Sequence, residues 1–127
     1  MSLKAVLIED NENNRYLLRL LLEHAGFAVV VLENGRSAVD TVRREAPDVV
    51  LLDIQMPEMD GYEVAAVLKR DPEAARVPIV GVSSFAMPGD RDKALRSGFA
   101  GYIEKPVDPE RFADSVMAFL RGAGAQK

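Results

Sequence analysis

Charged and hydroxyl side chains stand within two residues of the ends of four short apolar segments of this sequence. Glu9 and Asp10 follow VLI, Asp53 follows VVLL, Ser83 follows IVGV, and Lys105 stands two residues after YI. Carboxylates held close together raise one another's pKa, and a hard divalent cation is the usual counter-charge. The chain has no Cys and one His, so softer metals lack their ligands. If the fold brings these side chains together, the sequence predicts a Mg²⁺ site.

Asp53 is the candidate for covalent chemistry. An aspartate carboxylate can attack phosphorus and form an aspartyl phosphate. We expect Lys105 to pair with the phosphoryl oxygens as a compact charge and Ser83 to donate a hydrogen bond to one of them. Each residue alone has an ordinary explanation, since an Asp after a strand is commonly a helix cap and a Lys is commonly a solvated charge. Their joint appearance after four apolar segments favours a site.

The elements that must position these residues alternate along the chain. Nearly continuous apolar runs predict short strands, and helical spacing of apolar residues between them predicts helices. Because both faces of each strand are apolar, the strands belong in a parallel sheet between two helix layers. The expected strands cover residues 4–8, 28–32, 49–52, 79–82 and 101–103, and the expected helices cover residues 14–24, 36–45, 62–69, 90–97 and 109–121.

A strand–helix unit repeated five times predicts an α/β fold. The expected architecture is a doubly wound, five-stranded parallel sheet in a flavodoxin-like three-layer sandwich. In such sheets, ligands bind outside the carboxyl ends of the strands. All the candidate residues follow strands, so the topology predicts that they meet at one edge.

Length and composition limit the alternatives. The 127 residues predict one domain over residues 1–121, with a short flexible tail over residues 122–127. With 16 Lys and Arg against 20 Asp and Glu, we expect no nucleic-acid partner. No apolar run approaches the roughly 20 residues of a membrane span, and the start of the chain lacks a signal-peptide pattern. We therefore expect a cytoplasmic protein without a membrane partner.

The sequence resembles the receiver domains of two-component response regulators over residues 4–121. Four segments carry the resemblance: VLIEDN at 6–11, DVVLLDIQMPEMDG at 48–61, PIVGVSSFAM at 78–87 and GYIEKP at 101–106. The segments at 11–15 and 85–87 are similar to single-domain regulators of the cell-division type and to receivers fused to hybrid kinases. The resemblance implies a phosphorelay protein of signal transduction, itself a phosphoprotein.

The resemblance also implies roles for the acidic residues. Asp53 would accept a phosphoryl group from a histidine kinase or a histidine phosphotransfer protein. Asp10 would bind Mg²⁺ directly and Glu9 mainly through water, with the backbone carbonyl of Gln55 as a further ligand. The protein would not be an enzyme in the ordinary sense, since it would accept and slowly lose its own phosphoryl group.

Four further residues match the family's pattern: Ser83 and Tyr102 as its switch residues, Lys105 as a catalytic residue and Pro106 as a structural one. Ser83 replaces the Thr or Ser whose hydroxyl turns toward the phosphoryl group, and Tyr102 replaces the aromatic residue that moves inward on activation. Lys105 matches the family's lysine, and Pro106 follows a bond that is often cis in this family. The output would be a downstream protein that binds the face formed by the fourth helix, the fifth strand and the fifth helix.

Other readings remain open on the sequence alone. The chain is either a stand-alone receiver or a receiver from a larger hybrid kinase or multidomain regulator, and a phosphorylation-independent interaction module is a further alternative. A phosphohydrolase would need an acid where Gln55 stands, and a flavodoxin-like cofactor binder would need a phosphate-binding loop where the acidic residues 9–12 stand. Both are disfavoured.

Overall fold

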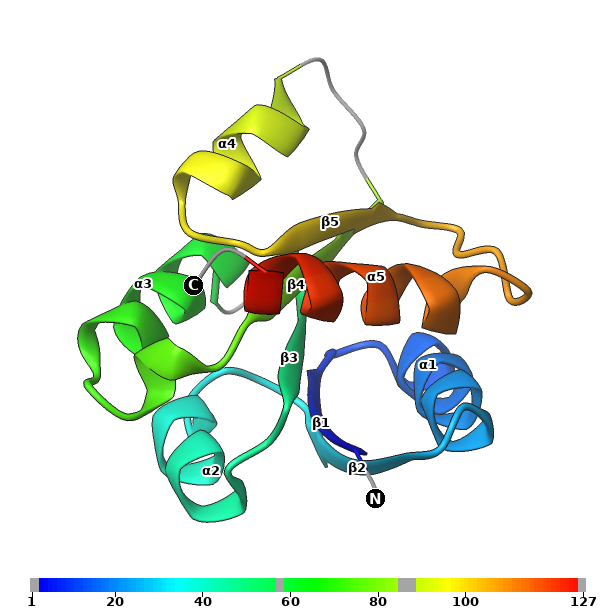
Figure 1. Cartoon of the computed structure of the whole chain (residues 1–127), viewed down its shortest axis with the longest axis horizontal. Coiled ribbons are helices and arrows are strands. Elements are labelled where there is room, and N and C mark those ends of the chain that lie inside the picture. Colours follow the sequence, from blue (N-terminus) through cyan, green and yellow to red (C-terminus); the bar gives the residue numbers. More distant parts are fainter. Residues whose placement is uncertain (1–2, 57–58, 85–88, 126–127) are drawn as a thin grey trace.

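The computed structural model describes residues 3–56, 59–84 and 89–125 of the chain. Strands and helices alternate along it (Figure 1). The strands are β1 (Leu3–Ile8), β2 (Phe27–Leu32), β3 (Val49–Asp53), β4 (Ile79–Ser83) and β5 (Gly101–Glu104). The helices are α1 (Glu12–His24), α2 (Ala38–Glu45), α3 (Gly61–Arg70), α4 (Asp90–Arg96) and α5 (Phe112–Ala125), with a 3₁₀ turn, η1, at Ala74–Arg76.

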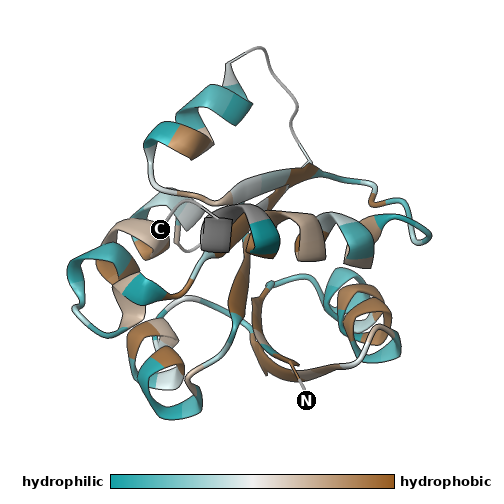
Figure 2. Ribbon diagram, in the orientation of Figure 1, coloured by the Kyte–Doolittle hydropathy of each residue, from teal (hydrophilic) through white to brown (hydrophobic). Residues whose placement is uncertain are grey.

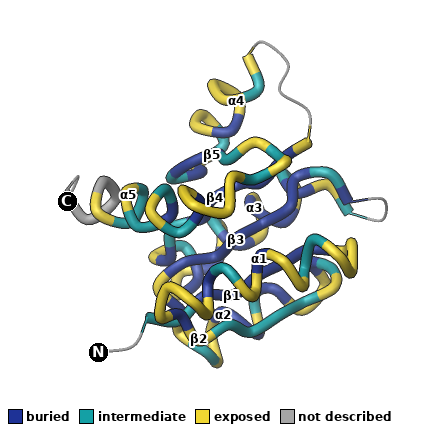
Figure 3. The backbone as a smooth tube through the Cα atoms, turned by 90° about the vertical axis from the view of Figure 1, so that its right-hand side faces the viewer, coloured by how far each residue is buried: buried dark blue, intermediate teal, exposed yellow. Residues whose placement is uncertain are grey.

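The strands form one parallel sheet in the order β2-β1-β3-β4-β5. β3 lies at the centre, and all five of its residues are buried (Figure 3). The strand order reverses between β1 and β3, which is the switch point where doubly wound sheets bind ligands. The predicted α/β sandwich is confirmed, because strands that are apolar on both faces must be covered on both.

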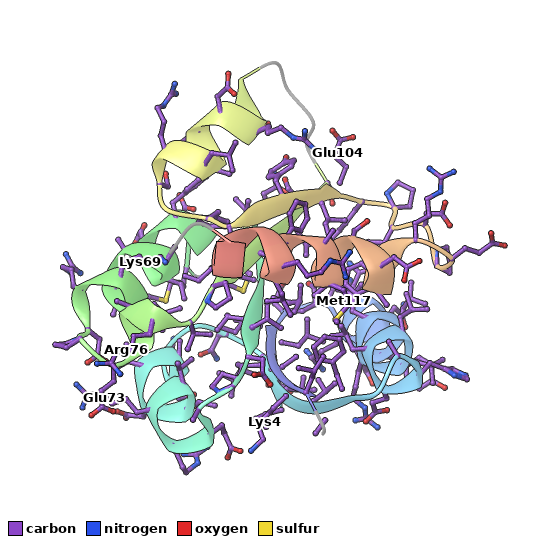
Figure 4. The ribbon with its side chains drawn as sticks, in the orientation of Figure 1. Lys4, Lys69, Glu73, Arg76, Glu104 and Met117 are labelled. Carbon is purple, nitrogen blue, oxygen red and sulfur yellow. The ribbon has the colours of Figure 1, made fainter. Side chains whose placement is uncertain are left out.

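Two hydrophobic clusters cover the sheet, one on each face. Alternate residues of each strand point to opposite faces, so Leu51 packs in one cluster and Leu52 in the other. Helices α1 and α5 complete the Leu51 side, and α2, α3 and α4 complete the Leu52 side (Figures 1 and 2). Met117 of α5 packs against the Leu51 cluster and lies on the side of α5 toward α1 (Figure 4).

Two helices that follow the central strands begin at side-chain caps. The Asn11 side chain accepts a hydrogen bond from the backbone N–H of Asn14 at 2.9 Å, and the Asp60 carboxylate accepts one from Tyr62 at 2.8 Å. These caps satisfy backbone donors that the first helical turn leaves unpaired. They tie the first turns of α1 and α3 to the loops that leave β1 and β3.

The end of the chain differs from the prediction. Helix α5 continues to Ala125, so residues 122–125 are helical where the sequence predicted a tail; residues 126–127 lie outside the described residues. Glycine costs a helix only about 1 kcal/mol, and an established helix adds residues easily. The helix also begins at Phe112 rather than 109, after a turn in which the Asp108 carboxylate accepts a hydrogen bond from the backbone N–H of Glu110 and its carbonyl accepts from those of Arg111 and Phe112.

In the described residues, no helix combines the length and the apolar character that crossing a membrane requires.

Candidate functional site

Three carboxylates meet at the carboxyl edge of the sheet. Ile8 of β1 pairs with Leu52 of β3, so the next residues on the two segments, Glu9 and Asp53, lie side by side. As a result, carboxylate oxygens of Glu9, Asp10 and Asp53 all lie within 4.8 Å of one another. Glu9 and Asp53 are 0% and 3% exposed, whereas Asp10 is open to solvent. Two of the three acids are therefore shielded from water, and the third forms the rim.

Lys105 supplies the counter-charge for the buried acids. Its ammonium nitrogen lies 2.8 Å from Glu9 Oε1 and 3.4 Å from Asp53 Oδ1, and its side chain is 12% exposed. The residue comes just after β5, two strands from β3, and the Lys105–Pro106 peptide bond is cis. Lys105, which stands 52 residues after Asp53 in the sequence, thus contacts the Asp53 carboxylate.

Burial and repulsion act on Asp53 together. Burial and the neighbouring Glu9 carboxylate raise the pKa of Asp53 from 3.8 to about 7, against the lowering effect of Lys105 and of the hydrogen bond from the Gln55 backbone. That backbone N–H lies 3.1 Å from Asp53 Oδ1. Without a further positive charge, the two buried acids, Glu9 and Asp53, hold one carboxylate more than Lys105 can neutralise.

Ser83 and Tyr102 lie on the strands beside Asp53. Ser83 ends β4, is 1% exposed, and follows Val82, which pairs with Asp53. Tyr102 of β5 is 5% exposed and packs in the cluster on the α3 and α4 side of the sheet. Its ring occupies an inward position in this structure.

Two contacts around the site were not anticipated from the sequence. The Gln55 side-chain oxygen accepts a hydrogen bond from the Ser84 backbone N–H at 3.0 Å, which joins the loops after β3 and β4. A Cβ on Gly61 would lie 2.5 Å from Ile54 Cα and 2.8 Å from the Asp53 carbonyl oxygen, so only glycine fits there. The Gly in the segment MDG was the available signal for this close approach.

The ligand atoms suit a hard cation. All three side-chain donors are carboxylate oxygens, and Asp10 leaves one side of the cluster open to solvent. Mg²⁺ prefers this combination, since it uses one or two carboxylates and keeps several waters. The acidic cluster could therefore hold a metal ion.

The comparison with protein families places the chain. The model of the response regulator receiver domain matches residues 5–117. The chain belongs to this family. Its signalling domains are not a classical enzyme family, and membership implies kinase or phosphotransfer partners and downstream targets in general terms.

Curated relatives of this receiver domain match it over almost its whole length. The polar-differentiation response regulator DivK of Brucella anthropi is 38% identical over 123 residues, which are 97% of this chain and 100% of the relative. DivK of Brucella ovis is 37% identical over the same shares. The similarity to single-domain regulators of the cell-division type is confirmed.

Solved receiver structures share the fold. The receiver domain of a Pseudomonas aeruginosa sensor histidine kinase is 28% identical, covers 98% of this chain and 99% of its own, and superposes with a TM-score of 0.82. That crystal structure has a magnesium ion coordinated in its active-site cleft. The chemotaxis protein CheY4 of Vibrio cholerae, 23% identical over 94% of this chain and 99% of its own, has a TM-score of 0.86 and supports the fold alone.

Proposed function

We propose that Asp53 of this receiver domain accepts a phosphoryl group from a histidine kinase or a histidine phosphotransfer protein. The observation that supports this assignment is the Asp53 carboxylate itself, which is buried, lies within 3.4 Å of the Lys105 ammonium and lies beside two further acids. A structural aspartate has no need of two acidic neighbours that repel it. The proposal includes a cytoplasmic location and the absence of nucleic-acid and membrane partners.

The transfer is a single displacement at phosphorus. An Asp53 carboxylate oxygen forms the new P–O bond while the P–N bond to the donor's imidazole breaks, and the bonding electron pair stays on that nitrogen, which takes up a proton from solvent. Lys105, already in contact with Asp53, would pair with a phosphoryl oxygen. Asp53 reacts as the carboxylate, and its pKa of about 7 makes the counter-charges around it important.

Mg²⁺ is the proposed cofactor. Asp10 and Asp53 would bind it directly, Glu9 mainly through water, and the Gln55 backbone carbonyl would complete the protein ligands. When bound, the cation supplies positive charge to the carboxylates and to the phosphoryl oxygens. The magnesium ion in the P. aeruginosa receiver supports this choice of metal.

The phosphorylated site would act on a protein-binding face. A phosphoryl group adds about two negative charges and new acceptor oxygens, toward which we propose that Ser83 turns. The loop over residues 84–89 would follow, although residues 85–88 lie outside the described residues. Tyr102 and the exposed Glu104 lie on β5 between α4 and α5, so the α4–β5–α5 face would change for a downstream partner (Figure 4).

The experiment that tests the proposal measures intact-protein mass after incubation with acetyl phosphate, with and without Mg²⁺. We expect one added phosphoryl group on the wild-type protein, dependent on Mg²⁺, and none on Asp53→Asn. Asp40→Asn, which neutralises an exposed aspartate on α2, is the matched control and should be labelled like the wild type. Labelling of Asp53→Asn to the wild-type level would refute the assignment.

A phosphorylation-independent module is the alternative outcome. In that case neither acetyl phosphate nor beryllofluoride would alter the wild-type protein, and partner binding would be the same for Asp53→Asn. The complete set of charged groups at the site, with Lys105 paired to two acids, favours the phosphorylated protein.

A further inference from the structure

We propose that Arg15 is a positioning residue that holds the main chain of Glu9 and Asp10 in place for the cation. The inference rests on the proposed function, because it assigns a role in the same metal site. Nη1 of Arg15 donates hydrogen bonds to the carbonyl oxygens of Glu9 and Asp10, at 3.1 and 3.0 Å. One guanidinium nitrogen, from a residue near the start of α1, therefore donates hydrogen bonds to the backbone of both acidic residues.

The backbone of Glu9 and Asp10 has to be held in place against electrostatic repulsion. Glu9 and Asp10 lie next to Asp53, and the three carboxylates repel one another when all are ionised. Asp10 is the exposed member, and its carboxylate accepts no hydrogen bond in the described contacts around the site, so its placement depends on its backbone. A backbone fixed before the cation arrives reduces the conformational cost of binding.

Several hydrogen bonds fix the loop of residues 9–11 between β1 and α1, and those from the Arg15 side chain go to the carbonyls of Glu9 and Asp10. The Asn11 backbone N–H donates to Glu9 Oε2 at 3.2 Å, and the Arg15 backbone N–H donates to the Asn11 carbonyl at 2.9 Å. The Arg15 guanidinium is itself oriented by Glu33, whose carboxylate lies 3.7 Å from Nη2 on the other side. The Arg15 side chain is 18% exposed and the Glu33 side chain is 77% exposed, so their ion pair lies at the surface. Of the two carbonyl contacts, the one to Glu9 is partly buried and the one to Asp10 is exposed.

The surroundings of Arg15 also allow it to be replaced without collapse of the fold. Arg15 lines a hollow of about 210 Å³ with Glu12, Tyr16, Arg19 and Val31. The hollow is open to solvent, so water can fill the space that the guanidinium leaves when it is removed. Loss of Arg15 should therefore loosen the acidic pair and leave the sheet intact.

Loss of the Arg15 charge and loss of its positioning role predict opposite changes in Mg²⁺ affinity. Removing a positive charge beside three carboxylates should by itself strengthen Mg²⁺ binding, whereas loosening Asp10 should weaken it. Arg15→Met removes both the charge and the hydrogen bonds. Arg15→Lys keeps the charge and loses the planar, multi-donor group. The direction of the change in Mg²⁺ affinity therefore identifies the role.

The test is a direct titration of each protein with Mg²⁺, followed by the amide NMR signals of the site and requiring no phosphorylation. We expect the Mg²⁺ dissociation constant to rise by about tenfold in Arg15→Met and in Arg15→Lys, the lower end of what loss of a residue behind a metal ligand typically costs. Arg19→Gln is the control and should stay within about twofold of the wild type. Arg19 pairs with the exposed Glu23 and contacts neither carbonyl.

A second readout separates positioning from general stability. In acetyl phosphate labelling, the Mg²⁺ concentration for half-maximal rate should rise in both Arg15 variants, while the rate at saturating Mg²⁺ returns to nearly the wild-type value. Unchanged or tighter Mg²⁺ binding by Arg15→Met, or wild-type affinity in Arg15→Lys, would overturn the role of Arg15. Failure of the wild-type protein to bind Mg²⁺ would instead overturn the proposed site.

Discussion

At the scale of single residues, the site is built from carboxylates whose negative charges repel one another. Glu9 and Asp53 are buried side by side, and Lys105 balances only part of their charge. Burial raises the pKa of Asp53 to about 7, so its ionised form is unfavourable in the folded state. The residue that we propose as the phosphoacceptor is therefore also a source of instability.

The pH dependence of folding should reveal this cost. Because the pKa of Asp53 is raised on folding from 3.8 to about 7, the folded protein binds a proton in that interval that the unfolded chain does not. The contribution of Asp53 to stability is therefore fully present below about pH 4 and is lost as the pH rises through 7. With a chelator present, Asp53→Asn should be more stable than the wild type by about 1–3 kcal/mol at pH 8.

Urea unfolding at a series of pH values measures the difference. It should shrink toward acid pH, and Asp40→Asn should show no such trend. A wild-type protein as stable as Asp53→Asn at pH 8 would contradict the predicted cost of ionising Asp53 in the folded state.

At the scale of elements, ion pairs fix helices to one another away from the site. Arg43 of α2 forms an ion pair and hydrogen bond with Asp71, the residue that ends α3. The Asp71 carboxylate also accepts hydrogen bonds from the backbone N–H groups of Glu73 and Ala74 and so starts η1. One side chain thereby connects α2, α3 and the turn before β4.

Replacement of this carboxylate should weaken the protein in a pH-dependent way. The Arg43 guanidinium lowers the pKa of Asp71 below its usual 3.8, so the pair stabilises the fold above that pH, and the stabilisation is lost as the pH falls through the lowered pKa. Asp71→Asn keeps an acceptor for η1 and removes the charge. We expect its urea midpoint to be below that of the wild type near neutral pH, and the difference to shrink as the pH falls below 3.8 through the lowered pKa. A deficit that stays constant over this pH range would show that the charge is not responsible.

At the scale of the whole molecule, one sheet carries two hydrophobic clusters that cannot form separately. Leu51 and Leu52 are adjacent on β3, are both fully buried, and pack on opposite faces. Each cluster needs the sheet, and the sheet needs both helix layers. The protein should therefore unfold as a single unit.

Cavity mutations on either face should have matching consequences. Leu51→Ala and Leu52→Ala should each lower the free energy of unfolding by about 2–5 kcal/mol, because each removes buried methyl groups and leaves a cavity. Circular dichroism and tyrosine fluorescence should report the same urea midpoint for each variant. Leu95→Ala, at a side chain that is 49% exposed on α4, should change stability by less than about 1 kcal/mol. Separate transitions would show that the two helix layers unfold independently.

Sequence reasoning predicted most of the fold because the signals are local. Because each strand is apolar on both faces, the sheet must be covered by helices on both faces. The alternation of strands and helices requires parallel pairing. Glu9, Asp10, Asp53 and Lys105 could be named because each stands after an apolar run, and parallel strands bring such positions to one edge. The end of α5 was misjudged, since glycine lowers helix propensity without fixing where a helix stops.

Only the tertiary structure decided how the charges are shared out. The preference of Lys105 for Glu9 at 2.8 Å over Asp53 at 3.4 Å depends on the relative placement of three strands. The two hydrogen bonds from Arg15 to backbone carbonyls depend on the orientation of α1 relative to the end of β1. Neither contact leaves a periodic signal in the sequence, because each depends on directions in space and on distances of a few ångströms. The residue types and their order determined which chemistry was available here, and packing determined which atoms meet to perform it.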